Sequence, residues 1–299
     1  MGSTAKAERS HRWDWVERVC NSWILIKMMW LLVPVLLIGF VSLVIRVQRR
    51  FIYFPRQYAP VELEHAKAAG VQEIRFRTSQ GNQAAFFWRN ADAEAAPRFI
   101  WLLFAGNGSV ALDWLGLIAQ FADPATGFLL VEYPGYGICE GSPNPQSILE
   151  NSENAFQALL GQKHWEIAAD AIGVLGHSLG GAAALQFAAK HAVRKIVTNS
   201  TFTTMDDMVR RTIYISLGPL LQHRFDNVTA LKAILSRNQI PEIDIYHGDA
   251  DQVVPVQMGR ALAQLDSEQI RFVTIAGGHH NDLLEEVLSL GLRPASSRR

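Results

Sequence analysis

The sequence has little cysteine and no excess of charge of either sign. Only Cys20 and Cys139 occur among 299 residues, too few for the disulfide framework of small secreted domains. Lys and Arg together number 28, and so do Asp and Glu, which gives a formal net charge of zero. This balance argues against the basic surface that binds nucleic acid. No nucleic-acid partner is therefore expected, and the length allows one large domain with a substantial core.

Long apolar runs are also absent, with one exception near the N-terminus. Residues 28–45 contain no charged side chain, and residues 23–26 extend the run on the other side of Lys27. About 18 to 20 apolar residues suffice for a helix to cross a bilayer. Residues 23–45 are therefore predicted to be a transmembrane anchor, which makes the chain a single-pass membrane protein.

A cleaved signal peptide is the alternative interpretation of this run. Arg46, Arg49 and Arg50 follow it, where a signal peptide would have a small-residue cleavage site, so an uncleaved anchor is favoured. Basic residues lie before the run as well. The positive-inside rule therefore does not orient the chain, and the side of the membrane on which the following domain lies stays open.

Beyond the anchor, short apolar runs alternate with segments of helical periodicity. Polar–apolar alternation at 73–77, a turn at 79–82 and a return run at 83–88 predict an antiparallel hairpin. Further strands are predicted at 99–104, 128–131, 172–175, 195–198, 243–246 and 271–275, and helices at 111–121, 146–160, 182–190, 256–265 and 282–290. This alternation predicts an α/β fold, with a mainly parallel central sheet and helices on both faces. Ligands of such sheets bind at the carboxyl ends of the strands.

The motif Gly-His-Ser-Leu-Gly-Gly at 176–181 lies between a predicted strand and a predicted helix. A serine in this context is typical of a nucleophile elbow, a strained turn that exposes the hydroxyl. Alone the motif fits an ordinary glycine turn equally well, but an apolar strand before it and a helix after it favour Ser178 as a nucleophile. The first helical amides then face the charge that develops in the reaction.

A carboxylate and a histidine follow later strands in the order that such a nucleophile needs. Asp251 comes after the strand at 243–246 and is the predicted partner of the base, with Asp249 as the alternative. His280, on a glycine-rich loop after the last strand, is the predicted base, with His279 as the alternative.

Donors for an oxyanion are expected from two backbone amides. Leu179 directly follows the predicted nucleophile, and Asn107 lies in a glycine-containing loop after the strand at 99–104.

Five motifs together resemble the alpha/beta-hydrolase superfamily, and within it the membrane-anchored serine hydrolases that include bacterial proteins of unassigned substrate and animal protein depalmitoylases. They are Phe104-Ala105-Gly106-Asn107, Glu132-Tyr133-Pro134-Gly135-Tyr136-Gly137, the turn at 176–181, Gly248-x-x-Asp251-x-x-Val254-Pro255 and His280-Asn281-Asp282. The match covers roughly residues 50–290. The group usually has histidine at position 105 and an Asp-Tyr-Arg-Gly sequence at 132–135, so this chain departs from it at both loops.

The resemblance and the residues predict a membrane-anchored serine hydrolase that cleaves an ester or thioester through an acyl-enzyme. Ser178, Asp251 and His280 would form the triad, Leu179 and Asn107 the oxyanion hole, and no metal or organic cofactor is expected. Membrane attachment favours a lipid-like or acylated substrate. A peptidase or amidase of the same fold and a non-enzymatic interaction module are the alternatives. The predicted divisions are a polar segment at 1–22, the anchor at 23–45, a connector at 46–60, the hydrolase domain at 61–292 and a tail at 293–299.

Overall fold

The computed structural model describes Trp23, Trp30 and residues 32–90, 97–121, 123–162 and 172–292. The predicted polar segment at 1–22 and the tail at 293–299 lie outside the described residues. The chain divides into two compact units, Met1–Gln48 and Arg49–Arg299, which are described one by one.

The N-terminal apolar run forms a helix at Leu32–Ile52, 21 residues with a mean hydropathy of 1.8 in its most apolar window. It is long and apolar enough to cross a membrane, although a signal sequence passes the same test. The helix continues beyond Ile45, so the first part of the predicted connector at 46–60 is helical instead. Residues 46–52 contain neither glycine nor proline, and the helix ends before Pro55.

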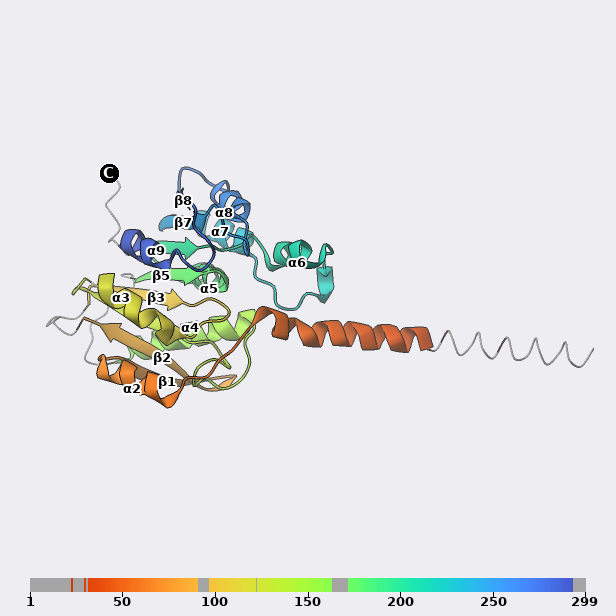
Figure 1. Cartoon of the computed structure of the whole chain (residues 1–299), viewed down its shortest axis with the longest axis horizontal. Coiled ribbons are helices and arrows are strands. Elements are labelled where there is room, and N and C mark those ends of the chain that lie inside the picture. The colour runs from red at the N-terminus through yellow and green to blue at the C-terminus, as the bar shows by residue number, and fades with distance from the viewer. Residues whose placement is uncertain are drawn as a thin grey trace, which may run out of the picture. The chain divides into compact units, whose positions relative to one another are not determined.

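The second unit is built on an eight-stranded sheet in the order β1-β2-β4-β3-β5-β6-β7-β8 (Figure 1). β2 runs antiparallel to both β1 and β4, and the remaining pairs are parallel. The predicted hairpin and the mainly parallel sheet are therefore confirmed. The strands are β1 Gln72–Thr78, β2 Gly81–Arg89, β3 Phe99–Phe104, β4 Thr126–Val131, β5 Ile172–His177, β6 Lys195–Asn199, β7 Glu242–Gly248 and β8 Ile270–Ile275.

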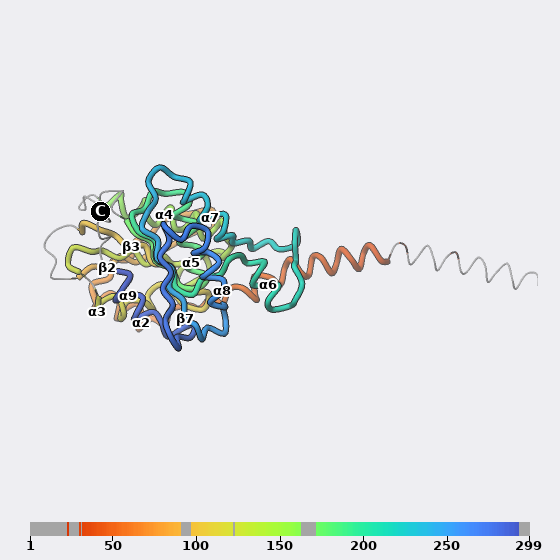
Figure 2. Tube along the Cα trace, turned by 90° about the horizontal axis from the view of Figure 1, so that it is seen from above, coloured from red at the N-terminus to blue at the C-terminus, as the bar shows by residue number. Residues whose placement is uncertain are grey.

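Helices cover both faces of the sheet (Figures 1 and 2). One face carries α4 (Pro145–Leu160), α5 (Leu179–Ala188), α7 (Asn227–Leu235) and α8 (Val256–Ala263), each in contact with the next along this series. The other face carries the 3-10 turn η1 (Ala111–Trp114) with α3 (Leu115–Phe121), which contacts α9 (Leu284–Gly291). The remaining elements are α2 (Pro60–Ala68), α6 (Met205–Ile213) and the 3-10 turn η2 (Gly218–Leu220).

Alternate residues of the central strands supply two apolar cores, one on each face. In β4, Leu129 and Val131 belong to one core while Phe128 and Leu130 belong to the other. All four are at most 1% exposed. This is why the central strands are continuous apolar runs in the sequence.

The sequence patterns did not predict α2. Pro60 occupies its first turn, and the Glu62 carboxylate accepts a hydrogen bond from the Ala59 amide at 2.7 Å. Ala66 is the only buried residue of the helix. The helix therefore has start signals but no apolar stripe, and periodicity could not reveal it.

Candidate active site

The turn between β5 and α5 holds Ser178 in an unusual backbone conformation. Its φ of 55° and ψ of −117° lie outside the common regions for a non-glycine residue. A Cβ on Gly176 would clash with the backbone of Gly180, and one on Gly180 would clash with the carbonyl oxygens of Phe104 and Ala105. Glycine at both positions therefore allows this tight strand–helix turn, which is the predicted elbow geometry.

Ser178, His280 and Asp251 meet at the carboxyl edge of the sheet, on loops that follow β5, β8 and β7. Ser178 Oγ lies 2.9 Å from His280 Nε2, and His280 Nδ1 lies 2.7 Å from Asp251 Oδ2. Each residue is less than 10% exposed. Because a carboxylate can only accept, Nδ1 carries the imidazole proton, and Nε2 is left to accept from the serine hydroxyl.

Four polar groups surround the Asp251 carboxylate. Oδ1 accepts from the amides of Val253 and Val254, both at 2.9 Å, and Oδ2 lies 2.7 Å from His280 Nδ1 and 3.4 Å from His247 Nε2. Burial alone would raise the pKa of Asp251, but the hydrogen bonds from His247, His280 and the Val254 amide together lower it. The carboxylate is therefore ionised and fixed in direction.

His247, at the end of β7, also faces this loop, and its Nε2 lies 2.8 Å from the Val254 carbonyl oxygen. Its closeness to Asp251 was missed. The four-residue spacing between His247, at the end of β7, and Asp251, in the loop that follows, is the signal that could have indicated it.

The alternative residues at these positions have other partners. Nδ1 of His279 lies 3.0 Å from the Ala250 carbonyl oxygen, and its side chain is directed to this loop at an exposed position. Asp249 accepts a hydrogen bond from the Gly277 amide at 2.7 Å and so shapes the turn. The structure brings neither of them to Ser178.

His177, the neighbour of Ser178, lies beside the imidazole of His280. The ring centroids are 4.9 Å apart, and His177 Nε2 donates to the His280 carbonyl oxygen at 2.8 Å. Burial, together with the charge that His280 can carry, lowers the pKa of His177 to about 4. Near neutral pH the ring is therefore uncharged, and it can hold the His280 loop without opposing a positive charge on His280.

The loop after β3 carries Asn107 next to the elbow, because its Phe104 and Ala105 carbonyls lie against Gly180. The carbonyl oxygen of Asn107 accepts from the Phe54 amide at 3.0 Å and from the Tyr136 hydroxyl at 2.7 Å. Its side-chain amide donates to the Ile52 carbonyl oxygen at 2.9 Å. The backbone amides of Asn107 and Leu179 take part in no hydrogen bond within the described chain.

The loop at 132–137 donates hydrogen bonds to the loop that carries Asn107. Tyr133 donates its hydroxyl to the Ala105 carbonyl oxygen at 2.7 Å, in addition to the bond from Tyr136. Glu132 is 1% exposed and accepts from the Tyr58 hydroxyl. Burial raises the pKa of Glu132 to about 7. These supporting contacts were not derivable from the motif, because each joins segments that are far apart in the sequence.

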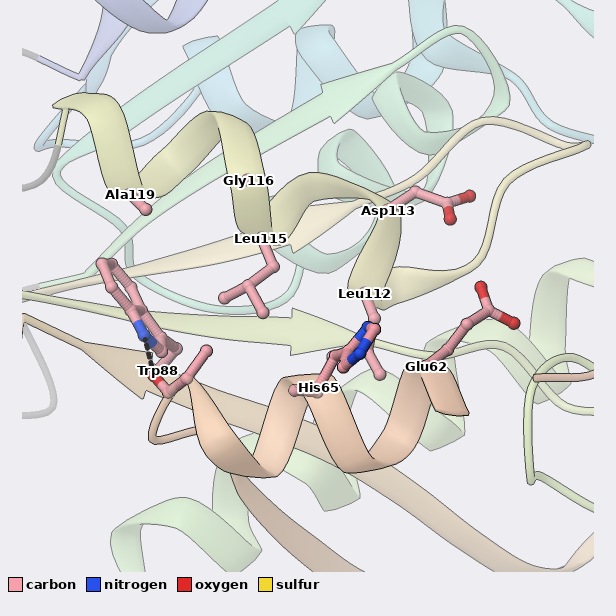
Figure 3. Close-up of a pocket in the computed structure, with 10 residues that line it drawn as sticks. Glu62, His65, Trp88, Leu112, Asp113, Leu115, Gly116 and Ala119 are labelled. Atoms are coloured by element: carbon pink, nitrogen blue, oxygen red, sulfur yellow. Dashed lines mark hydrogen bonds between the residues drawn. The ribbon is translucent and has the colours of Figure 1, made fainter. Parts of the chain in front are cut away.

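Within the described residues, no group of three or more His, Cys, Asp or Glu side chains could hold a metal ion. A hollow of about 450 Å³ lies between α2 and the η1–α3 segment (Figure 3). Glu62, His65, Trp88 and Asp113 are among its lining residues, and none of the three residues at the carboxyl edge lines it. This hollow is therefore separate from the candidate active site.

The fold and the site geometry define the alpha/beta-hydrolase class, and comparison with known proteins agrees. The sequence model of the Alpha/beta hydrolase family matches residues 101–237, and the chain has the alpha/beta-hydrolase fold. An uncharacterized protein of Mycobacterium tuberculosis is 26% identical over 82% of this chain and 84% of its own length.

Solved structures share the fold at lower sequence identity. An alpha-beta hydrolase from Vibrio vulnificus has a TM-score of 0.58 at 17% identity, over 78% of this chain and 84% of that one. The esterase domain of a Rhodothermus marinus protein has a TM-score of 0.54 at 20% identity, over 73% and 95% of the two chains.

Proposed function

We propose that this alpha/beta hydrolase is a membrane-anchored serine hydrolase that cleaves an ester or thioester through an acyl-enzyme. The observation that carries the proposal is the unbroken series of short contacts from Ser178 Oγ to His280 and on to Asp251. A nucleophile, a base and a carboxylate that orients the base are the three groups that acyl transfer by serine requires.

The reaction begins when the Ser178 oxygen attacks the substrate carbonyl and His280 Nε2 takes the hydroxyl proton. Asp251 stabilises the imidazolium that results. His280 then gives the proton to the leaving group, which departs as the acyl-enzyme forms. A water molecule, deprotonated by His280, attacks this second ester and releases the acid, and the proton returns to Ser178.

The oxyanion of each tetrahedral intermediate needs two hydrogen-bond donors, for which we propose the amides of Leu179 and Asn107. Two features favour them: neither amide has an intramolecular acceptor among the described residues, and the Asn107 carbonyl is held by two donors. A fixed donor costs no reorganisation when the charge develops.

An ester or thioester is favoured by likeness of fold to proteins that include an esterase domain of Rhodothermus marinus. The helix at Leu32–Ile52 is the basis for the proposed anchor. An enzyme tethered to a bilayer meets acyl chains at its surface, so we propose a lipid-like or acylated substrate.

The experiment is covalent labelling with a fluorophosphonate probe, which reacts with activated serine nucleophiles. Wild-type protein should be labelled at Ser178, located by mass spectrometry, and Ser178→Ala should not be labelled. Ser200→Ala is the matched control, since Ser200 is buried at the end of the neighbouring strand β6 and also has a positive φ, 53°. It should label like the wild type. A folded wild-type protein that takes no label would contradict the proposal.

A further inference from the structure

The α/β unit exposes a group of large apolar side chains at the end of α6. Ile213, Tyr214 and Ile215 are consecutive in sequence and are 49%, 90% and 67% exposed. Single exposed apolar residues are ordinary, but three together at one tip are not. In the described part of this unit, the large apolar residues that are exposed are Phe51, Phe54, Val61, Ile213, Tyr214, Ile215 and Val253.

Two contacts join most of this set into one region. The Tyr53 ring meets the His223 ring edge-on, with centroids 5.3 Å apart, so Phe51 and Phe54 lie close to the chain that follows α6. The Arg211 guanidinium donates to the Gln252 carbonyl oxygen at 3.3 Å, which places Val253 beside α6 as well. Only Val61 of the exposed set has no such link. Figure 2 shows α6 and the loop after it projecting from the body of the α/β unit.

The backbone conformation of Tyr214, at the end of α6, is unfavourable for a residue other than glycine or asparagine. Tyr214 ends α6 in the left-handed conformation, with φ 60° and ψ 11°, and its amide donates to the Arg210 carbonyl oxygen at 2.8 Å. Glycine or asparagine is usual at such a cap. An aromatic side chain here is strained and also almost fully exposed, so packing within the described chain does not account for it.

We propose that Ile213, Tyr214 and Ile215, together with Phe51 and Phe54, form a lipid-contacting surface that enters the interface of the bilayer crossed by the N-terminal helix. The bilayer is the partner that we choose for this surface, because the helix that can cross it is directly joined to the α/β unit. Ile52 is the last residue of the candidate span, so Tyr53 lies at the membrane surface when the helix crosses it. The contact between Tyr53 and His223 then holds the chain after α6 at the same surface.

The chemistry of the tip suits the region between lipid headgroups and acyl chains. Tyrosine is enriched at membrane interfaces because its ring is apolar and its hydroxyl is polar, and the two isoleucines add apolar area without charge. Arg210 is paired with Asp206 at 2.8 Å, and α6 also carries Arg211 and Asp207. Because the charges of α6 balance, the contact should form on neutral lipid and need no anionic headgroup.

The lipid contact stands independently of the proposed catalytic function, but it has a consequence for that function. Arg211 touches the loop that carries Asp251, so the surface lies next to one wall of the candidate active site. An acyl ester held in the bilayer would then reach Ser178 without passing through bulk water.

The test uses the full chain reconstituted in phosphatidylcholine vesicles, with an environment-sensitive fluorophore on a single introduced cysteine. Cys20→Ser removes one native thiol, and Cys139 can stay because it is buried and 5% exposed. Tyr214→Cys and Ile215→Cys carry the probe at the tip. Glu268→Cys is the matched control. Glu268 is exposed in the turn before β8, at the amino end of the strand and so on the side of the sheet opposite its carboxyl edge.

Nitroxide-labelled phosphatidylcholine should quench most of the emission at positions 214 and 215 and leave position 268 unchanged. Added salt should not reverse the quenching. Unquenched emission at the tip, in protein that floats with the vesicles, would overturn the proposal. So would a blue shift that depends on protein concentration and not on lipid, because a second copy of the chain would then cover the tip. Protein that fails to float would overturn it as well.

As a functional check, Ile213→Ser combined with Ile215→Ser should lose hydrolysis of an ester embedded in vesicles while hydrolysis of a short soluble ester is retained. Loss of both activities would point to the active site itself, and loss of neither would contradict the consequence drawn for substrate access. Failure of wild-type protein to hydrolyse either ester would bear on the proposed function alone, since the quenching experiment needs no catalysis.

Discussion

Asn107 offers the sharpest test of the proposed oxyanion hole, because its side chain and its backbone amide have separate roles. The side-chain amide makes one hydrogen bond, to the Ile52 carbonyl oxygen at 2.9 Å. The carbonyl oxygen has two further donors, the Phe54 amide and the Tyr136 hydroxyl. Asn107→Ala therefore removes one of three bonds that hold this residue and leaves the backbone N–H in place.

The expected loss follows from the kind of bond removed. One neutral hydrogen bond contributes about 1 kcal/mol, which corresponds to about a fivefold change in rate if all of it is felt in the transition state. Loss of an oxyanion donor itself typically costs about 100-fold to 1000-fold. Asn107→Ala should thus slow the reaction about fivefold, well short of the loss of a donor.

The measurement is the second-order rate constant for fluorophosphonate labelling of Ser178, which requires no knowledge of the natural substrate. Asn154→Ala is the control, since Asn154 makes a similar bond to the Glu150 carbonyl oxygen at 2.8 Å within α4. It should label at the wild-type rate. A loss of about 100-fold or more in Asn107→Ala would mean that the side chain contacts the reacting oxygen. An unchanged rate would refute the positioning role of the Ile52 contact.

Two further predictions concern stability. Unfolded His177 binds a proton below about pH 6.5, whereas the pKa of folded His177 is lowered to about 4. The unfolded state binds more protons between these values, so acidification across this range should cost up to about 3 kcal/mol. Urea unfolding at several pH values should show this loss in wild type and not in His177→Gln; an equal slope in both would contradict it. Lys195 is buried against Glu242 and Asp244 at 3.2 and 3.6 Å. Lys195→Ala should therefore lower the free energy of unfolding by about 3 kcal/mol, since buried charge is left behind, and an unchanged denaturation midpoint would rule this out.

The sheet was predictable because its signals are local. Each buried strand is a short apolar run, and β1 alternates polar with apolar residues before the turn at Ser79-Gln80 that joins it to β2. α4 begins where Pro145 follows Asn144, whose side chain accepts from the Ser147 amide at 2.9 Å. Helix α2 escaped prediction because it buries one alanine, and so the pattern that identifies a core-facing helix is absent from it.

In the candidate site as well, features that depend on neighbouring residues were predictable, and contacts between distant residues were not. The preference for His280 over His279 followed from the Asn281-Asp282 that comes next, and the preference for Asp251 over Asp249 from the Val254-Pro255 after it. The structure brings together the residues that were preferred in each case. The contacts that hold these residues in place could not be predicted from the sequence. His177, for example, contacts the His280 carbonyl oxygen across 103 positions of the sequence, and no motif encodes such a pair.

The segment after the N-terminal helix belongs to the α/β unit and is more than a connector. Backbone groups of Ile52 and Phe54 hold Asn107, and the Tyr58 hydroxyl accepts from the Leu112 amide at 3.0 Å while donating to the buried Glu132. A shift of this segment would therefore break these bonds or displace the loop on which the proposed oxyanion donor lies. Direct hydrogen bonds thus join the end of a candidate membrane span to the loop that carries Asn107, so the position of the helix end is linked to the shape of the proposed oxyanion hole.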